Sequence, residues 1–330
     1  MSKRTMRNSW FVVLTFVLAL AMPSLAEQRT VLIVYSYDEG LAWTRQCDKG
    51  IREALPGDVS IERLFMDTKR IPQEKFISRA EMVVKEFRRI QPDLVMVSDD
   101  TALRLVGPEI AATGVPVVYF GINGNPRDYF VSLPKNVTGL IERIPLLHWV
   151  RILFDIIPEA DSLLVLMDTS PTADAIIKSS FRGRDWIEFE EKTVGWKKAT
   201  DWADWQRSVL ESESEIILMP IYHSLKNENG THIPYDEVVS WTSKNSPVPV
   251  FATQDYAVGD QGVIGALVVF GEEHGRLAGV IAKKILDGIS VLDLSTADDQ
   301  HGIMYFNPKG LKRFDIHLPK AFEGKVIYKQ

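Results

Sequence analysis

The sequence predicts an α/β protein of two Rossmann-like lobes, each built on a parallel sheet. Short runs rich in Val, Ile and Leu alternate with amphipathic stretches of helical period, a pattern typical of parallel sheets that helices cover on both faces. The alternation restarts after a segment that contains Gly124, Pro126 and Pro134. A chain of 330 residues also suits two domains better than one.

Four strands and three helices are expected in the first half. Each strand is an apolar or β-branched run bounded by polar residues, and each helix repeats its apolar side chains at helical spacing, as Cys47, Ile51 and Leu55 do. The expected strands are Val31–Tyr35, Val59–Phe65, Asp93–Val97 and Val115–Phe120, and the other two helices are Phe76–Ile90 and Ala102–Ala112.

The second half continues the same alternation, now beginning with a long amphipathic helix. The expected helices are Leu146–Ile157, Ala173–Phe181, Lys198–Leu210 and Tyr235–Lys244, and the expected strands are Ser162–Met167, Ile187–Val194, Glu215–Pro220 and Val248–Ala252.

A late strand and helix follow the glycine-rich stretch from Gly259 to Gly265. The strand covers Ala266–Phe270, and the helix carries Leu277 and Ile285 on its apolar face. Because this unit has no sheet of its own, we expect it to return to the first lobe. The expected division is a first lobe at 27–124 plus 259–290, a second lobe at 125–258, and a hinge-crossing segment and tail at 291–330. Several strands crossing between the lobes would form a hinge over a cleft.

The N-terminal residues 1–26 predict a secretory signal peptide. Lys3, Arg4 and Arg7 precede an apolar run from Trp10 to Met22, and small residues then lead to a cleavage site after Ala26. The apolar run is shorter than the roughly 20 residues of a membrane-spanning helix. An uncleaved N-terminal anchor is the alternative interpretation.

Charge and cysteine content favour a periplasmic location. The chain has a net charge of −6, and the leader contains three basic residues and no acidic one, so the mature protein is more acidic still. An acidic protein is a poor candidate for binding nucleic acid. Cys47 is the only cysteine, which excludes an intrachain disulfide.

Polar side chains follow the carboxyl ends of the expected strands, where open parallel sheets bind ligands. Hydroxyl, amide and carboxylate groups there are typical orienting partners of a small organic ligand, although polar residues are also common in loops. The candidate ligand-binding residues are Ser36, Tyr37, Trp43, Thr44, Asp99, Asp100, Thr101, Gly121, Asn123, Asp168, Thr169, Ser170, Tyr222, His223, Gln254 and Asp255.

These candidates favour a ligand with an apolar or aromatic body and an amine or amide donor. Tyr37, Trp43 and Tyr222 offer flat apolar surfaces, while the carboxylates offer acceptors, namely Asp99, Asp100 and Asp255. Asp255 is the strongest candidate for an ammonium or amide contact. A polyanion such as a phosphate ester would be repelled by the acidic residues.

Motifs for catalysis are mostly absent, so we expect a protein that is not an enzyme and needs no cofactor. The sequence has no nucleophile elbow, phosphate loop or zinc-protease motif, and its six histidines lack metal-ligand spacing. The acids Asp38, Asp99, Asp100 and Asp168 leave one alternative open, a Mg²⁺-dependent periplasmic hydrolase.

Two segments carry a family resemblance. Asn136-Val137-Thr138-Gly139 precedes a long helix that ends in Ile157-Pro158-Glu159-Ala160, and Val248–Asp255 precedes glycines at 262, 265, 271, 275 and 279. In order and spacing, over nearly the whole mature chain, they resemble the ABC transporter substrate-binding family related to tryptophan- and tyrosine-type binding proteins. The resemblance implies a type I periplasmic-binding fold that closes on a ligand and delivers it to a membrane permease.

The N-terminal lobe points to an alternative partner. Ser36-Tyr37, Trp43-Thr44 and the segment Ser98–Leu103 look closer to the extracytoplasmic input domains of some histidine kinases and diguanylate cyclases. The amino-acid binders usually carry small uncharged residues where Asp99 and Asp100 stand, which argues against an aromatic amino-acid ligand. A ligand-sensing receptor for a separate membrane sensor protein is therefore the second interpretation. A monomer is expected in either case.

Overall fold

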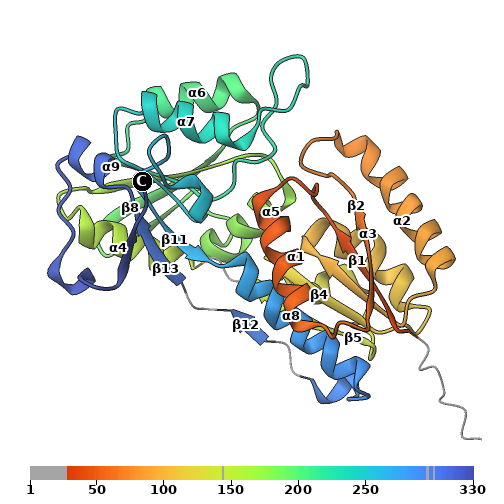
Figure 1. Ribbon diagram of the computed structural model, residues 1–330. Helices are drawn as coiled ribbons and strands as arrows, with labels where there is room; N and C mark the ends of the chain where they lie inside the picture. Colours follow the sequence, from red (N-terminus) through yellow and green to blue (C-terminus); the bar gives the residue numbers. More distant parts are fainter. Residues whose placement is uncertain (1–27, 143–144, 295–296, 300–301) are drawn as a thin grey trace, which may run out of the picture.

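The computed structural model describes residues 28–142, 145–294, 297–299 and 302–330. Two α/β lobes lie side by side, and the C-terminus lies in the second one (Figure 1). The expected signal peptide and its cleavage site after Ala26 lie outside the described residues. Within the described ranges, no helix is long and apolar enough to span a bilayer.

The first lobe is built on a six-stranded, all-parallel sheet. Its strand order is β12-β5-β4-β3-β1-β2. The strands are β1 (Thr30–Tyr35), β2 (Ser60–Phe65), β3 (Leu94–Ser98), β4 (Val117–Ile122), β5 (Val137–Glu142) and β12 (Ala297–Asp299), and the helices of this lobe are α1 (Ala42–Ala54), α2 (Phe76–Ile90), α3 (Asp99–Ala111) and α8 (Gly271–Leu286).

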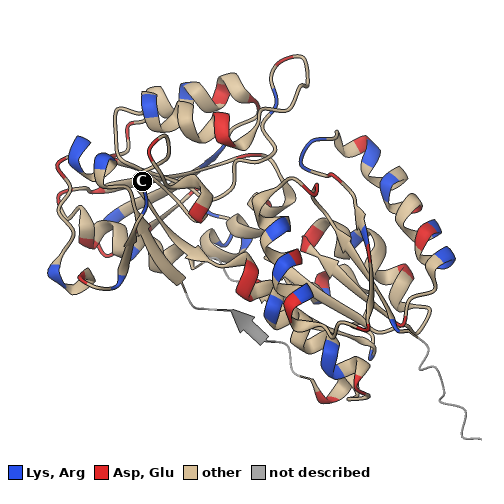
Figure 2. Cartoon of the chain, viewed as in Figure 1, with Lys and Arg blue, Asp and Glu red and all other residues tan. Residues whose placement is uncertain are grey.

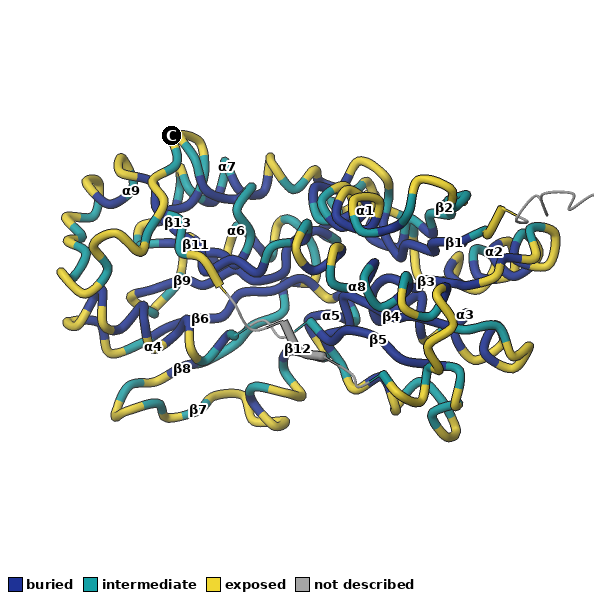
Figure 3. The backbone as a smooth tube through the Cα atoms, turned by 60° about the horizontal axis from the view of Figure 1, so that its bottom comes forward, coloured by how far each residue is buried: buried dark blue, intermediate teal, exposed yellow. Residues whose placement is uncertain are grey.

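Alternate side chains of this sheet enter two separate cores, as the period of a strand requires. Ile33 on β1 packs with the α1 and α8 side chains Ile51 and Ala278. Its neighbour Val34 faces the opposite core, which contains residues of α2 and α3 such as Val84. The strands β1, β3, β4 and β5 are therefore buried along almost their whole length, whereas the edge strand β2 is only partly buried and the outer surfaces of the helices are exposed (Figure 3).

The second lobe is built on an eight-stranded sheet in the order β14-β13-β11-β10-β9-β6-β8-β7. The strands are β6 (Ser162–Met167), β7 (Trp186–Phe189), β8 (Lys192–Lys198), β9 (Ile216–Met219), β10 (Val250–Ala252), β11 (Gly265–Val269), β13 (Gly302–Phe306) and β14 (Val326–Tyr328), and the helices are α4 (Leu146–Ile156), α5 (Pro171–Ile176), α6 (Trp202–Leu210), α7 (Tyr235–Asn245) and α9 (Pro308–Arg313).

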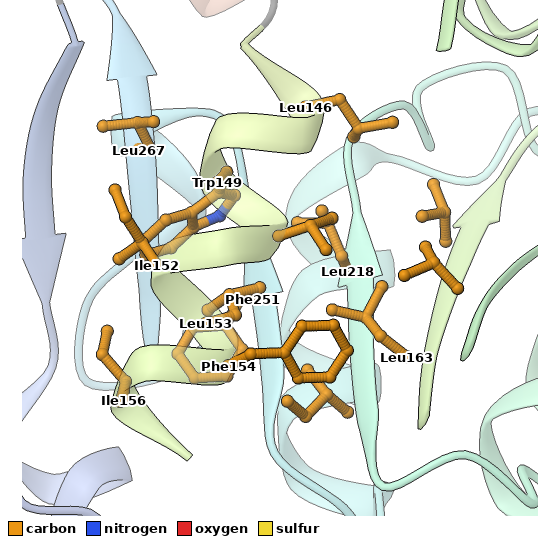
Figure 4. Close-up of a cluster of buried hydrophobic side chains, with 14 of the residues drawn as sticks. Leu146, Trp149, Ile152, Leu153, Phe154, Ile156, Leu163, Leu218, Phe251 and Leu267 are labelled. Carbon is orange, nitrogen blue, oxygen red and sulfur yellow. The ribbon is translucent and has the colours of Figure 1, made fainter. Parts of the chain in front are cut away.

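Helix α4 anchors one face of the second sheet. Trp149 and Leu153 lie on its buried side among strand residues that include Leu218 and Phe251 (Figure 4). The indole Nε1 of Trp149 also donates a hydrogen bond of 2.9 Å to the carbonyl of Ala252. A fully buried tryptophan thus fills the core and satisfies its one polar side-chain atom, which fixes α4 on this face of the sheet.

The second sheet is mixed rather than wholly parallel. The single strand expected at 187–194 is a hairpin, because Glu190 and Glu191 turn the chain with positive φ angles of 51° and 69° and let β7 run antiparallel to β8. β13 pairs antiparallel with β11 and parallel with β14, so the residues expected as a tail extend the sheet.

The late strand differs from the expectation, because it lies in the second sheet. β11 pairs with β10 and β13, and only the helix that follows it, α8, packs on the first lobe. Gly275 allows α8 to approach α1, since a Cβ atom there would lie 2.1 Å from the carbonyl oxygen of Cys47. The physical reason for the split is that the strand is buried between two partners of its own lobe.

The boundary expected at 124–125 also differs from the sheet pairing. β5 follows the linker but pairs with β4 in the first sheet, so the chain leaves this lobe after Glu142. It passes between lobes three times, namely between β5 and α4, between β11 and α8, and between β12 and β13. The other domain limits stay a prediction.

Candidate functional site

A cavity lies between the two lobes, where the carboxyl ends of both sheets face each other. It encloses about 630 Å³ of empty space, counting the part open to solvent. The first lobe and the crossing after β5 contribute Tyr37, Leu41, Trp43, Gln46, Lys69, Asp99, Asn123, Glu142 and Pro145 to its lining; the second lobe contributes Thr172, Ile221, His223, Thr253, Gln254, Asp255, Tyr256, Leu267, Val268 and Val269.

Tyr37 brings the end of β1 into contact with the opposite lobe. Its hydroxyl and the Thr172 hydroxyl share a hydrogen bond of 3.3 Å across the cavity. Ser36, by contrast, does not line the cavity. Its hydroxyl donates to the carbonyl of Ser98 at 2.8 Å and accepts from the backbone N–H of Ala102 at 2.8 Å, so it joins β1 to the start of α3.

Asp99 is the buried carboxylate of the first lobe that lines the cavity. It stands in the left-handed backbone region, with φ of 66°, and is only 3% exposed. Burial raises its pKa to about 7, against the opposing effects of a hydrogen bond from the Ser98 hydroxyl and the positive charge of Lys69. At neutral pH this carboxyl group is therefore divided between its acid and its ionised form.

Asp100 holds the loop after β4 rather than lining the cavity. Its oxygens accept hydrogen bonds from the backbone N–H groups of Asn123 (3.1 Å) and Gly124 (2.9 Å) and from the hydroxyl of Tyr129 (2.6 Å). Burial raises its pKa, although these donors act in the opposite direction. Three donors leave this carboxylate little capacity for a ligand.

Asn123 and Glu142 form a second polar group on the first lobe. The Asn123 amide donates to Glu142 Oε2 at 3.1 Å, and both residues line the cavity. Gly121, just before them, has φ of 68° and donates its backbone N–H to His274 Nε2 at 2.8 Å. Its contribution is to the shape of the loop, since it is not a lining residue.

In the second lobe, Asp168 lies beneath the cavity wall. It is 1% exposed and accepts backbone hydrogen bonds from Ser170 (2.9 Å) and Ser224 (2.8 Å). Burial would raise its pKa, but the charge of Lys69 and these hydrogen bonds outweigh burial and lower it. Asp168 therefore stays ionised and positions the loops after β6 and β9.

His223 and Tyr256 form the aromatic part of the second-lobe wall. His223 Nε2 and the Tyr256 hydroxyl share a hydrogen bond of 3.0 Å. Burial, together with the charge of Lys69, lowers the pKa of His223 to about 3, so the ring is neutral. Tyr222 stacks on His223, with ring centroids 4.2 Å apart, but lies behind it in the core.

Asp255 bridges the lobes on the hinge side of the cavity. Its Oδ1 accepts a hydrogen bond of 3.1 Å from the amide of Gln46 on α1, and its Oδ2 lies 3.6 Å from Lys329 Nζ. Next to it, Gln254 donates its amide to the carbonyl of Pro220 at 2.6 Å, and its Oε1 has no hydrogen-bond partner among the described residues.

The structure thus brings part of the candidate set together. Tyr37, Trp43, Asp99, Asn123, His223, Gln254 and Asp255 line the cavity. The candidates outside the lining are Ser36, Thr44, Asp100, Thr101, Gly121, Asp168, Thr169, Ser170 and Tyr222. Most of this second group is buried directly behind the wall, because strand ends also carry the side chains that tie loops to the sheet.

Three polar residues that line the cavity are not among the candidates, namely Lys69, Glu142 and Thr172. Lys69 and Glu142 contribute charge, and Thr172 contributes a contact between the lobes. Lys69 follows the end of β2, a strand whose carboxyl end carries none of the candidate residues. Glu142 ends β5, which lies in the stretch interpreted as a linker, and Thr172 follows Ser170 by two residues. Lys69 and Glu142 thus have the same sequence signal as the candidates, because each lies at or just after the carboxyl end of a strand.

Two further contacts join the lobes outside the cavity. Lys226 Nζ donates to the carbonyl of Ile71 at 3.1 Å, and Lys178 forms an ion pair of 2.8 Å with Asp128. Together with the contacts of Tyr37 and Asp255, they hold the lobes against each other around the cavity. Within the described ranges, no group of three or more His, Cys, Asp or Glu residues is arranged to hold a metal ion.

Comparisons with known proteins place this geometry in context. The family profile described as ABC transporter substrate binding protein matches residues 49–324. None of the curated protein sequences matches the chain.

Among solved structures, the chain is similar to an ABC domain in complex with L-Trp from Streptococcus pneumonia, with a TM-score of 0.70, 17% identity, and coverage of 92% of this chain and 100% of the other. It is also similar to a conserved domain protein from Vibrio cholerae (TM-score 0.67, 16% identity, 92% and 100% coverage). A third similar structure is a ligand-free, open substrate binding protein with adhesive properties from Clostridium difficile (TM-score 0.61, 17% identity, coverage of 92% of this chain and 99% of the other). At these identities the similarity shows a shared fold.

Proposed function

Because the chain belongs to the ABC transporter substrate binding protein family, we propose that it captures a small organic ligand in the cavity between its lobes and delivers it to a membrane permease. The resemblance inferred from sequence and the type I periplasmic-binding fold are confirmed. The observation that carries the proposal is the cavity itself, to which both lobes contribute walls that meet through Tyr37 and Thr172.

Closure of the lobes is the proposed means of capture. A ligand that touches both walls makes its full set of contacts only when the lobes are together, so binding shifts the population toward the closed form. The three passages of the chain between lobes would serve as the hinge. A permease could then recognise the loaded protein by its closed shape.

The proposed setting is the periplasm, with the protein exported by the signal peptide at 1–26 and acting as a monomer. In the cartoon of Figure 2, acidic and basic residues alternate along helices such as α2 and α8 rather than forming one basic stretch. This distribution supports a partner other than nucleic acid.

Trp43 and Asp255 are proposed to contact the ligand. Trp43 offers a flat surface on the first lobe, and Asp255 offers an acceptor for an amine or amide on the second. Loss of a charged acceptor should weaken binding roughly 10- to 100-fold.

Mass spectrometry of the small molecules that co-purify with the protein, followed by calorimetry, tests both assignments. Asp255→Ala and Trp43→Ala should each weaken binding of the identified compound. The matched controls are Asp260→Ala and Trp186→Ala, because both side chains lie outside the cavity. A ligand that binds all four variants equally well would contradict the proposed site.

A signalling partner is the second candidate function. The segment Ser98–Leu103, which forms the end of β3 and the start of α3, favours a membrane histidine kinase or diguanylate cyclase as the receiver of the closed form. A pull-down from membranes in the presence of ligand separates the two functions. Capture of a kinase or cyclase without a permease would overturn delivery as the function.

A further inference from the structure

Lys69 places a buried ammonium group at the wall of the cavity. It follows β2 in a loop that Thr68 fixes, because the backbone N–H and the hydroxyl of Thr68 both donate to the carbonyl of Ser36 at 2.9 Å. Lys69 is 5% exposed and lines the cavity. Its position is therefore set by the backbone of the first lobe rather than by a partner of its own side chain.

The ammonium group of Lys69 forms neither a hydrogen bond nor an ion pair with any residue that the structure describes. Its recorded contact is a cation–π contact with the ring of Tyr37, whose centroid lies 4.8 Å from Lys69 Nζ. A cation over an aromatic ring gains part of the stabilisation that it loses with its water. It still lacks the acceptor that a buried charge requires.

The titratable groups around Lys69 are already engaged elsewhere. Asp168, in the opposite lobe, directs its oxygens to the backbone of Ser170 and Ser224. Asp99 accepts the Ser98 hydroxyl and is partly protonated at neutral pH, and His223 is neutral. These groups influence Lys69 through space, but none contributes a direct acceptor.

Two other carboxylates of the cavity lining, Glu142 and Asp255, lie toward its other end. Three strand spacings, roughly 14 Å, separate the end of β1 beside Lys69 from the end of β5, where Glu142 stands. Glu142 receives the amide of Asn123, and Asp255 receives that of Gln46. Apart from Asp99 and the buried Asp168, the carboxylates around the cavity therefore lie toward the hinge, away from Lys69.

We propose that Lys69 receives a singly charged anionic group of the ligand, so that the cargo is an organic acid. The inference rests on the proposed function and narrows its substrate class. A carboxylate seated between the lobes would supply the acceptor that Lys69 lacks and would lie within reach of the Thr172 hydroxyl and the His223 ring on the opposite wall. A doubly charged phosphate is disfavoured, because Asp99 and Asp168 are close.

Paired probes test the sign of the charge that Lys69 recognises. The panel contains phenylacetate, tryptophan and 6-aminohexanoate, each with its own primary amide, together with phenethylamine as a cation. Calorimetry on the wild type should show at least one carboxylate that binds about 30-fold or more tightly than its amide. Lys69→Met should abolish that preference, and Lys69→Arg should keep it.

Arg70→Met is the matched control, since Arg70 is the adjacent residue, lies outside the cavity and pairs with Asp67 at 2.6 Å. It should keep the preference for the carboxylate. Thermal unfolding of each variant establishes that it is folded. Three outcomes would each reject the role of Lys69. The amides could bind as tightly as the carboxylates, the preference for the carboxylate could survive in Lys69→Met, or no carboxylate of the panel could bind.

Small-angle X-ray scattering with the same panel measures closure of the lobes, and it therefore distinguishes failure of the Lys69 assignment from failure of the proposed ligand capture. Closure of the lobes by an amide or an amine, with no closure by any carboxylate of the panel, would leave capture standing and reject the assignment of Lys69. Scattering that no compound changes, with no bound compound found after purification, would count against capture itself.

Discussion

Replacing Asp99 with Asn should stabilise the protein at neutral pH and have little effect at acidic pH. Burial raises the pKa of Asp99 from 3.8 to about 7, so the folded state holds a proton that the unfolded chain has already released. The stability contributed by the protonated group is complete below the unfolded pKa and is lost as the pH rises through the folded one. The amide of an Asn side chain does not titrate in this range, so the variant does not lose this stability as the pH rises.

The size of the effect follows from the difference between the two pKa values. A gap of about three pH units corresponds to about 4 kcal/mol, at about 1.4 kcal/mol per unit. The difference in unfolding free energy between Asp99→Asn and the wild type should therefore grow from pH 4 to pH 7 and level off above it. Asn also accepts the left-handed backbone at this position, where φ is 66°.

Urea denaturation of both proteins at each pH unit from 4 to 8 measures this difference. Asp204→Asn is the control of opposite sign. Although burial acts to raise the pKa of Asp204, hydrogen bonds from the Thr200 backbone and from Lys197 outweigh burial and lower it, so its contribution is lost as the pH falls. A stability difference for Asp99→Asn that does not change with pH would refute the reasoning.

Two further changes test the packing and the closure. Gly275→Ala should lower the free energy of unfolding by about 1–3 kcal/mol, because its Cβ would lie 2.1 Å from the Cys47 carbonyl oxygen. Gly57→Ala is the control, because a Cβ there meets no atom within 4 Å; equal losses in the two variants would contradict the close approach of α8 to α1. Tyr37→Phe removes the hydrogen bond to Thr172, which should reduce the stability of the closed form by about 1 kcal/mol and weaken ligand binding several-fold. Unchanged affinity in calorimetry would show that this contact does not support closure.

The sequence was most informative where apolar residues form continuous runs. The strand Val31–Tyr35 and the helix Phe76–Ile90 match the structure to within a residue, because burial on both sheet faces or on one helical stripe leaves a clear period. Pairing partners were harder to infer. The strand at 266–270 has the same apolar pattern whichever sheet it joins, and only its contacts with β10 and β13 decide the lobe.

The site was predictable as a region but not residue by residue. Strand ends identified Tyr37, Asp99 and Asp255, all of which line the cavity. The same rule also selected Ser36 and Asp168, whose polar atoms are used to hold loops in place. Whether a strand-end side chain faces a ligand or the backbone depends on its rotamer and on the neighbouring loop, and neither is encoded in local spacing.

The contact between α1 and α8 has a consequence for the order in which the chain folds. Lys49 and Glu272 pair at 2.9 Å although 223 residues separate them in sequence, and α8 completes the core of a lobe that begins with the first strand. The second lobe likewise gains β13 and β14 only at the end of the chain. Neither sheet is complete until the strands β12 to β14 have been synthesised. Folding must therefore close long loops late, which predicts slow acquisition of the complete native structure.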